Sequence, residues 1–260
     1  MSDMLAVGGA NTGANFSAAP WPAVRKVLEV AGWLAVAILV FTGLSAIFGR
    51  AAFMSDALSQ PIANPEEVFD AFEIRYFNNS VATFLHLGPG FLVMVLGPMQ
   101  FMRGLRKNYL NAHRWSGRVF LICGVIGALS GIAIGVFDPF MGVDGQGFNE
   151  SMATAFLSAY IFFALIMAYR KIRQRQFGAH REWMIRAFAL LLAIATERLM
   201  LTVLMGATGI DVAILFGTTF WMAGVTNLAA AEIWISLTRT PGNGARHWKD
   251  VDAKAAASST

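Results

Sequence analysis

The stretch AHRWSGRVF, at Ala112–Phe120, returns in altered form as AHREWMIRAF at Ala179–Phe188. Each copy opens on a histidine and an arginine, carries a second arginine, and leads into a long apolar run. Basic and aromatic residues at the start of an apolar run are typical of the end of a transmembrane helix. The two copies therefore predict two membrane-spanning helices that enter the bilayer from the same side.

The composition of the whole chain points to the same class. Of 260 residues, 56% are hydrophobic and 14% are charged, and the mean hydropathy is +0.55, unlike an ordinary soluble domain. The net charge of +4 comes from short basic stretches between apolar segments, where such residues orient helices, so we exclude nucleic-acid binding. The single cysteine, Cys123, excludes an intrachain disulfide and a multi-thiolate metal site.

The apolar segments predict an all-α, polytopic membrane helical bundle with six transmembrane helices. The expected spans are Val27–Gly49, Ser80–Phe101, His113–Val136, Met152–Tyr169, Glu182–Met205 and Val212–Leu237. Lysine and arginine crowd the N-terminal flank, the second and fourth connections and the C-terminal region. This distribution predicts that both termini are cytoplasmic, in a multi-pass protein of the bacterial inner membrane.

Three regions follow from this pattern. We expect residues 1–20 to be a disordered N-terminal tail and residues 21–238 to form the six-helix transmembrane domain. Residues 239–260 are expected to be a flexible C-terminal tail. Within the domain, the polar connection Arg50–Asn79 carries apolar residues at helical spacing around Phe72. It predicts either an amphipathic helix on the membrane surface or an ordinary structured loop.

Two spans contain residues that alter helix geometry. Gly-Pro pairs end at Pro89 and Pro98, so we expect the second span to be kinked or locally opened. In the third span, Gly127, Gly131 and Gly135 stand four residues apart. Such a face lets another helix approach closely.

Polar residues in the predicted outer half of the bilayer form a first candidate site. His86, Glu197 and Arg198 are expected at similar depth, and intramembrane charges need partners or a cavity. They would suit proton exchange or the binding of a polar headgroup or a quinone carbonyl. A structural ion pair that holds the second and fifth spans together is the alternative.

Histidines at the predicted cytoplasmic face form a second candidate site. His113 and His180 could be the two axial ligands of a b-type haem, because imidazole is a normal haem ligand and bundles build cofactor sites from facing helices. Both histidines lie at helix entrances and each precedes an arginine. The chain has four histidines and one of them, His247, is in the tail, so it cannot supply the four ligands that two bis-histidine haems need. Copper, held by these histidines and by Met99 and Met102, is a further alternative.

Four arginines near these histidines allow a third interpretation. These are Arg114, Arg118, Arg181 and Arg186. They could hold an anionic ligand or a lipid headgroup, or they could anchor the helices at the membrane interface. Glu182 stands at helical spacing from Arg186 and could neutralise it.

Several motifs together resemble a known family. They are HLGP at His86–Pro89, LGPMQF at Leu96–Phe101, HRWSGRVF at His113–Phe120 and HREWMIRAFAL at His180–Leu190. They closely resemble an uncharacterised family of bacterial predicted membrane proteins, domain of unknown function 2306, from about the second span through the fifth. The resemblance implies a membrane protein of six to seven helices and supplies no established activity. A looser similarity, in histidines near helix ends, is to b-type cytochromes and to haem or copper assembly factors of terminal oxidases.

These observations lead to a membrane protein that is haem-binding or redox-associated through His113 and His180, with electron transfer as its expected role. The alternatives are a non-catalytic accessory protein that binds lipid, quinone or a membrane-protein partner, and a small-molecule transporter. A transporter would agree with the altered second span and with a parallel duplication of spans three and four as five and six. The chain shows no nucleotide-binding loop or nucleophile triad, so the sequence assigns no reaction.

Overall fold

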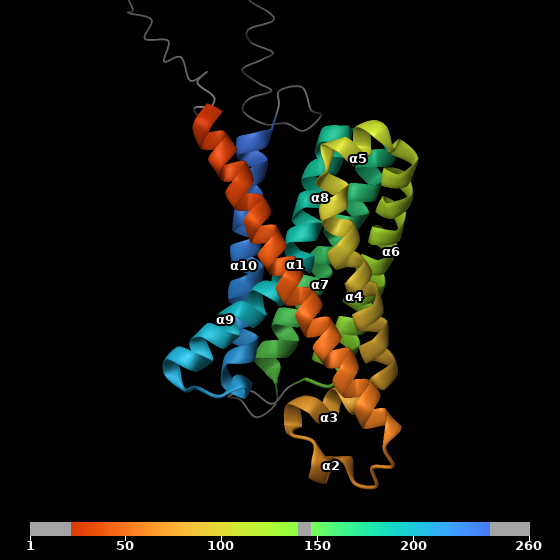
Figure 1. The fold of residues 1–260 in the computed structure, drawn as a ribbon, viewed down its shortest axis with the longest axis vertical. Coiled ribbons are helices and arrows are strands. Elements are labelled where there is room, and N and C mark those ends of the chain that lie inside the picture. Colours follow the sequence, from red (N-terminus) through yellow and green to blue (C-terminus); the bar gives the residue numbers. More distant parts are fainter. Residues whose placement is uncertain (1–21, 140–146, 240–260) are drawn as a thin grey trace, which may run out of the picture. The chain divides into compact units, whose positions relative to one another are not determined.

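The computed structural model describes residues 22–139 and 147–239, and the regular elements in those ranges are all helices. They are α1 (Pro22–Ser59), α2 (Pro65–Val68), α3 (Ala71–Asn78), α4 (Ser80–Phe101), α5 (Arg103–Asn108), α6 (Leu110–Gly135), α7 (Phe148–Arg173), α8 (Phe177–Leu191), α9 (Ala193–Thr208) and α10 (Val212–Thr238) (Figure 1). The predicted tail at residues 1–20 and the predicted tail beyond Arg239, including His247, lie outside the described residues.

Six helical segments are long and apolar enough to cross a membrane. They are Lys26–Ser59, Ser80–Phe101, Leu110–Gly135, Phe148–Arg173, Phe177–Thr208 and Val212–Thr238. This confirms the all-α bundle with six spans. The first span continues to Ser59, beyond the predicted end at Gly49, because no helix-breaking residue follows Gly49 until Pro61. The cytoplasmic location of both termini stays a prediction.

The chain forms two units, Met1–Ala37 and Ile38–Thr260. The described part of the first unit is the N-terminal part of α1, whose apolar side chains, such as Val27 and Leu34, are exposed. The second unit contains the rest of α1 and all the other helices. The packing, the cavity and the site described below belong to this second unit.

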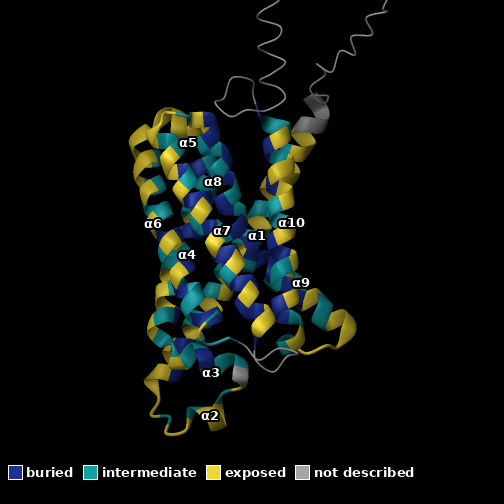
Figure 2. Cartoon of the chain, turned by 180° about the vertical axis from the view of Figure 1, so that it is seen from behind, coloured by how far each residue is buried: buried dark blue, intermediate teal, exposed yellow. Residues whose placement is uncertain are grey.

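Neighbouring spans of the second unit pack against one another in order along the chain. α4 packs on α6, α6 on α7 and α7 on α8, and α10 contacts α7, α8 and α9. Large apolar side chains on the outer faces are exposed, for example Ile122, Phe156 and Val225 (Figure 2). Outward-facing apolar surface of this kind is stable in lipid and not in water, so these helices contact the bilayer.

The glycine face of α6 is used for packing within the chain. A Cβ at Gly135 would lie 2.8 Å from the Oγ1 atom of Thr154 on α7, and one at Gly124 would lie 3.1 Å from Leu165. Gly131 faces the ring of His86 on α4, whereas nothing lies within 4 Å of a Cβ at Gly127. The expected close approach is therefore found toward α7, at Gly135, whereas Gly131 makes only ordinary contact with α4.

The fifth span is interrupted at Leu192, between α8 and α9. The second span forms one helix, α4, through Pro89 and Pro98, and the kink or local opening expected there stays a prediction. The side chain of Asn227 on α10 donates from Nδ2 to the carbonyl oxygen of Ala189 across 2.9 Å. A side chain inserted into the backbone hydrogen-bond ladder is a known cause of a sharp bend, and here it replaces a lost helical bond.

The polar connection between the first two spans is not one amphipathic helix. It contains α2 and α3, separated at Phe69 and Asp70. Asp70 ends the extended link because its carboxylate accepts from the backbone N–H groups of Phe72 and Glu73, which caps α3. Of the two alternatives, this arrangement agrees better with a structured loop, and α3 directs the Arg75 side chain into the protein, where it is buried.

Candidate functional site

A cavity of about 550 Å³ lies among the helices of the second unit. Its walls come from α1 beyond Gly43, α3, α4, α6, α7, the two halves of the fifth span and α10. Most of the wall is apolar and includes Val93, Met94, Leu157 and Leu190, while charged and aromatic groups gather where α1, α3 and α9 meet it. The cavity is therefore amphipathic.

An arginine–aromatic cluster forms the charged part of the wall with Arg50, Arg75, Arg198, Tyr76 and Phe216, and Phe72 packs behind it. The guanidinium carbon of Arg50 lies 4.3 Å from the ring centre of Tyr76 and 5.3 Å from that of Phe72. The Arg198 guanidinium lies 5.6 Å from the Phe72 ring and 5.2 Å from the Phe216 ring. Aromatic faces attract cations, so the rings hold these arginines together despite their like charges.

Arg75 has the strongest ionic partner of the three arginines. Its Nη1 atom donates to Oε1 of Glu150 across 2.6 Å, and both side chains are buried. Its Nη2 atom donates to the hydroxyl of Tyr76 at 3.1 Å. Burial disfavours the charge, but Tyr76 and Glu150 outweigh it and raise the pKa of the Arg75 guanidinium above its usual value. This pair joins α3 to α7 and keeps Arg75 charged.

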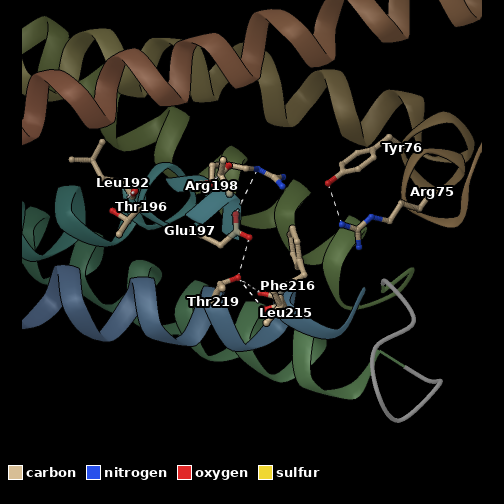
Figure 3. Close-up of polar contacts among 10 residues, drawn as sticks. Arg75, Tyr76, Leu192, Thr196, Glu197, Arg198, Leu215, Phe216 and Thr219 are labelled. Atoms are coloured by element: carbon tan, nitrogen blue, oxygen red, sulfur yellow. Dashed lines mark hydrogen bonds and ion pairs between the residues drawn. The ribbon is translucent and has the colours of Figure 1, made fainter. Parts of the chain in front are cut away.

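Glu197 is fully buried beside the cluster, and Figure 3 shows its carboxylate between Arg198 and Thr219. The Nε atom of Arg198 is 3.6 Å from Glu197 Oε2, and the Thr219 hydroxyl is 3.3 Å from Oε1. Consecutive residues on a helix project about 100° apart, which keeps this ion pair long. The interhelical partner of Glu197 is thus the hydroxyl of Thr219 on α10, and the nearest cation is Arg198, the next residue in the chain. This ion pair lies within α9 and does not join the second and fifth spans.

Arg50 differs from the other two arginines in having no carboxylate at ion-pair distance among the described residues. Glu73 also lines the cavity and is close enough for electrostatic interaction with Arg50. Arg198 is 27% exposed and also lines the cavity. Two guanidinium groups can therefore meet a ligand in the cavity.

His86 lines the cavity from α4 and lies close enough to interact electrostatically with Arg198. Its Nδ1 atom is 3.0 Å from the carbonyl oxygen of Gly127 and 3.3 Å from the hydroxyl of Ser130. A carbonyl oxygen only accepts, so Nδ1 carries a hydrogen and donates it to Gly127. The structure thus brings the three predicted residues of this site, His86, Glu197 and Arg198, into one region.

The predicted haem ligands lie elsewhere. His113 and His180 are near enough to each other to interact electrostatically, but neither lines the cavity. His180 Nδ1 lies 2.9 Å from the carbonyl oxygen of Ala168, whereas Nδ1 of His113 is buried without a hydrogen-bond partner among the described residues. A histidine that ligates a metal through one ring nitrogen normally donates a hydrogen bond from the other ring nitrogen. His180 has such a hydrogen bond at Nδ1 and His113 lacks it.

The four arginines near these histidines do not converge on one ligand. Arg114 and Arg118 are exposed on α6. On α8, Arg181 donates to the Thr238 hydroxyl at 2.8 Å, and Arg186 binds Glu232 with contacts of 2.5 and 2.9 Å. The two α8 arginines are thus bound to α10, and both a shared anion site and interfacial anchoring stay predictions.

Glu182, the expected partner of Arg186, binds Arg239 instead. Nε of Arg239 donates to Oε1 of Glu182 across 2.7 Å, the Nη2 atom contacts the other carboxylate oxygen, and both side chains are buried. Arg239 directly follows α10 and begins the region assigned to the flexible tail, yet this residue is held in place.

Copper receives no added support from the described residues. They contain no group of three or more histidine, cysteine, aspartate or glutamate side chains that could hold a metal ion. Met102 is exposed at the end of α4, while Met99 is half-buried. A copper site made with these methionines stays a prediction.

Sequence reasoning did not find Arg50, Arg75 and Glu150 as site residues. Arg50 and Glu150 stood at span ends, where charges normally face water, and Arg75 stood in a connection that was expected to lie on the surface. One available signal was the single arginine in an otherwise aromatic and apolar stretch at Arg50, whereas Arg75 stands among acidic residues as well as aromatic ones.

Comparison with known families supports the motif-based resemblance. The family described as "Predicted membrane protein (DUF2306)" matches residues 83–235. The chain belongs to this family. The match covers the spans that carry the HLGP motif and both histidine–arginine motifs, and its description gives this DUF2306 protein a membrane location without an activity. No curated protein and no solved structure matches the chain.

Proposed function

We propose that this DUF2306 protein, in a bacterial inner membrane, binds an anionic amphiphile inside its helical bundle. The acidic head contacts Arg50 and Arg198, and the apolar body fills the rest of the cavity. The observation that carries the proposal is Arg50, a cavity-lining guanidinium with no carboxylate at ion-pair distance in the described part of the chain.

The chemistry of the head follows from the donors. A guanidinium presents several N–H groups in a planar fork, which matches a carboxylate or a phosphate. A charge within a bilayer is costly unless it is paired, and stacking on Tyr76 compensates Arg50 only in part. A bound anion would complete this compensation.

The chemistry of the body follows from the remaining wall. Val93, Met94, Leu157, Leu190 and Ile194 offer only apolar surface. A cavity of about 550 Å³ falls within the range of small-molecule sites in proteins, about 300 to 1,000 Å³. A single acyl or isoprenoid chain with one acidic group has the required combination of properties, and a quinone, which lacks the negative charge, fits the arginines less well.

Transport of the same ligand is the second candidate function. Leu190, Leu191 and Ile194 line the cavity and flank the interruption of the fifth span. Transporters commonly place their binding sites at discontinuous helices. Haem binding at His113 and His180 stays a hypothesis with less support, because neither residue reaches this cavity.

The experiment measures binding of radiolabelled laurate to the purified protein by scintillation proximity, with unlabelled competitors. Laurate and dodecyl phosphate should both compete, and their relative affinities show whether the site prefers a carboxylate or a phosphate head, while dodecanol should not compete. Arg50→Gln should lower the affinity about tenfold or more, and Arg50→Lys should lower it less.

The matched control is Arg106→Gln, because Arg106 is exposed on α5 and does not line the cavity. This variant should bind laurate as the wild type does, and thermal unfolding should show that each variant is folded. Equal displacement by dodecanol and laurate, or unchanged affinity in folded Arg50→Gln, would contradict the proposal.

A further inference from the structure

Glu197 is a buried carboxylate beside the cavity with only weak partners. It has no exposed surface, and its Oε2 atom has no hydrogen-bond partner among the described residues. Its nearest cation is Arg198, at 3.6 Å. A buried carboxylate keeps its charge only with good partners, so the charge of Glu197 depends on this long ion pair and on the hydroxyl of Thr219 at 3.3 Å.

Arg198 is shared between Glu197 and the cavity. It lines the cavity wall and stacks on Phe72 and Phe216, which hold its guanidinium away from an ideal approach to Glu197. An anion that binds Arg198 from the cavity side competes directly with Glu197 for the same cation.

The charged groups around the cavity sum to no net charge without a ligand, although Arg50 has no carboxylate at ion-pair distance among the described residues. Arg50 on α1, Arg75 on α3 and Arg198 on α9 face three carboxylates, Glu73 on α3, Glu150 on α7 and Glu197 on α9. His86 on α4 also faces Arg198. An added anion leaves one uncompensated negative charge in a low-dielectric site, and a proton from water can neutralise it.

Thr219 can accept the hydrogen of a protonated Glu197. The Thr219 hydroxyl has two backbone acceptors, the carbonyl oxygens of Leu215 and Phe216, each at 3.0 Å. When the hydroxyl donates to one of these carbonyls, its lone pair faces Glu197 Oε1 at 3.3 Å (Figure 3). The neutral carboxylic acid therefore has a hydrogen-bond partner that the structure already provides.

We infer that the site takes up one proton with each anion and that Glu197 is the proton acceptor. The anion pairs with Arg198, the Glu197–Arg198 interaction weakens, and an O–H bond forms on Glu197 with a proton from water. The ligand stays anionic and Glu197 becomes neutral, so the charge of the site does not change. This inference rests on the proposed function and adds the proton as a second bound species.

The first test counts protons during laurate binding by titration calorimetry in two buffers that differ in ionisation enthalpy. Wild type should take up about one proton per laurate, and its affinity should fall as the pH rises, by up to about tenfold per unit. Glu197→Gln should bind laurate with no proton uptake, and the control Glu232→Gln, at an exposed glutamate, should behave as wild type. Laurate binding without proton uptake in wild type, or uptake that persists in Glu197→Gln, would overturn the inference while leaving the proposed function intact.

A second test needs no ligand. In Arg198→Gln, Glu197 loses its cation, so the infrared spectrum should gain the carbonyl band of a protonated carboxylic acid, and Glu197→Gln in the same chain should remove it. Absence of this band in folded Arg198→Gln would overturn the inference. Failure of wild type to bind laurate would instead contradict the proposed function, and this band would still decide the behaviour of Glu197.

Discussion

Asn227 on α10 donates its side-chain amide to the backbone carbonyl oxygen of Ala189 across 2.9 Å, at the point where the fifth span is interrupted. Its Oδ1 atom also accepts from the Thr196 hydroxyl at 2.9 Å, on the other half of the span. One side chain thus bridges α8 and α9 from a neighbouring helix. The bend has an identified cause, and that cause can be removed.

Replacement of Asn227 by leucine should destabilise the protein by about 1–3 kcal/mol, because the carbonyl of Ala189 and the hydroxyl of Thr196 lose a buried partner. Thermal unfolding in detergent, followed by circular dichroism, measures the change. Thr226→Val, at the exposed neighbouring position, is the control and should leave the midpoint nearly unchanged. Equal stability of the two variants would show that the bend does not depend on Asn227.

Two ion pairs between α8 and the region of α10 should differ in their contribution to stability. Arg239→Met leaves Glu182 buried without its cation and should cost about 3–5 kcal/mol. Arg186→Met removes the partner of Glu232, whose side chain is 46% exposed, and should cost about 1 kcal/mol or less. Thermal unfolding of both variants checks the order, and a larger loss in Arg186→Met would reverse the assignment.

Two glycines of α6 should respond oppositely to the same substitution. Gly135→Ala places a Cβ 2.8 Å from Oγ1 of Thr154 and should destabilise the α6–α7 packing by about 1–3 kcal/mol. Gly127→Ala meets nothing within 4 Å and should be neutral or slightly stabilising. Gly135 is the last residue of α6 and Gly127 lies in its interior, so any gain in helix propensity falls on Gly127→Ala and widens the expected difference between the two melting curves.

A larger side chain at Gly127 should obstruct the cavity without unfolding the protein. Gly127→Leu projects into the cavity that Gly127 lines, and we expect laurate affinity to fall about tenfold or more. Gly104→Leu, at an exposed glycine of α5, is the control. Normal laurate binding by folded Gly127→Leu would place the ligand outside this cavity.

The haem hypothesis makes a separate prediction. If His113 and His180 are axial ligands, the purified protein should show a Soret band that sharpens on reduction with dithionite. Alanine at either position should abolish that band, while His86→Ala, at the cavity, should keep it. A full band that persists in both His113→Ala and His180→Ala would exclude this ligand pair.

Hydropathy predicted the six spans well because burial in lipid is a property of each segment alone. The second span agrees with α4 at both ends, Ser80 and Phe101. The same reasoning could not place Arg75, since whether a polar connection lies on the surface or folds inward depends on partners such as Glu150. The interruption at Leu192 was also missed, because no glycine or proline marks it and its cause, Asn227, lies on another span.

The candidate site was recognised in part for the same reason. His86, Glu197 and Arg198 stood out because charged or titratable groups inside apolar runs are rare. Their counterparts on α1 and α3 stood near span ends, where charge is ordinary. The sequence alone could not show that the residues on α1 and α3 belong to the site. That required the three-dimensional packing, in which α3 contacts α4.

The polar residues of the fifth span have consequences for how the protein is made. Glu182, Arg186, Thr196 and Glu197 have partners on α10 or just after it, at Arg239, Glu232, Asn227 and Thr219 respectively. During synthesis the fifth span emerges first, carrying charges that lipid alone accommodates poorly. We therefore expect the last two spans to enter the bilayer together as a helical hairpin, so that each charge meets its partner before it meets the acyl chains.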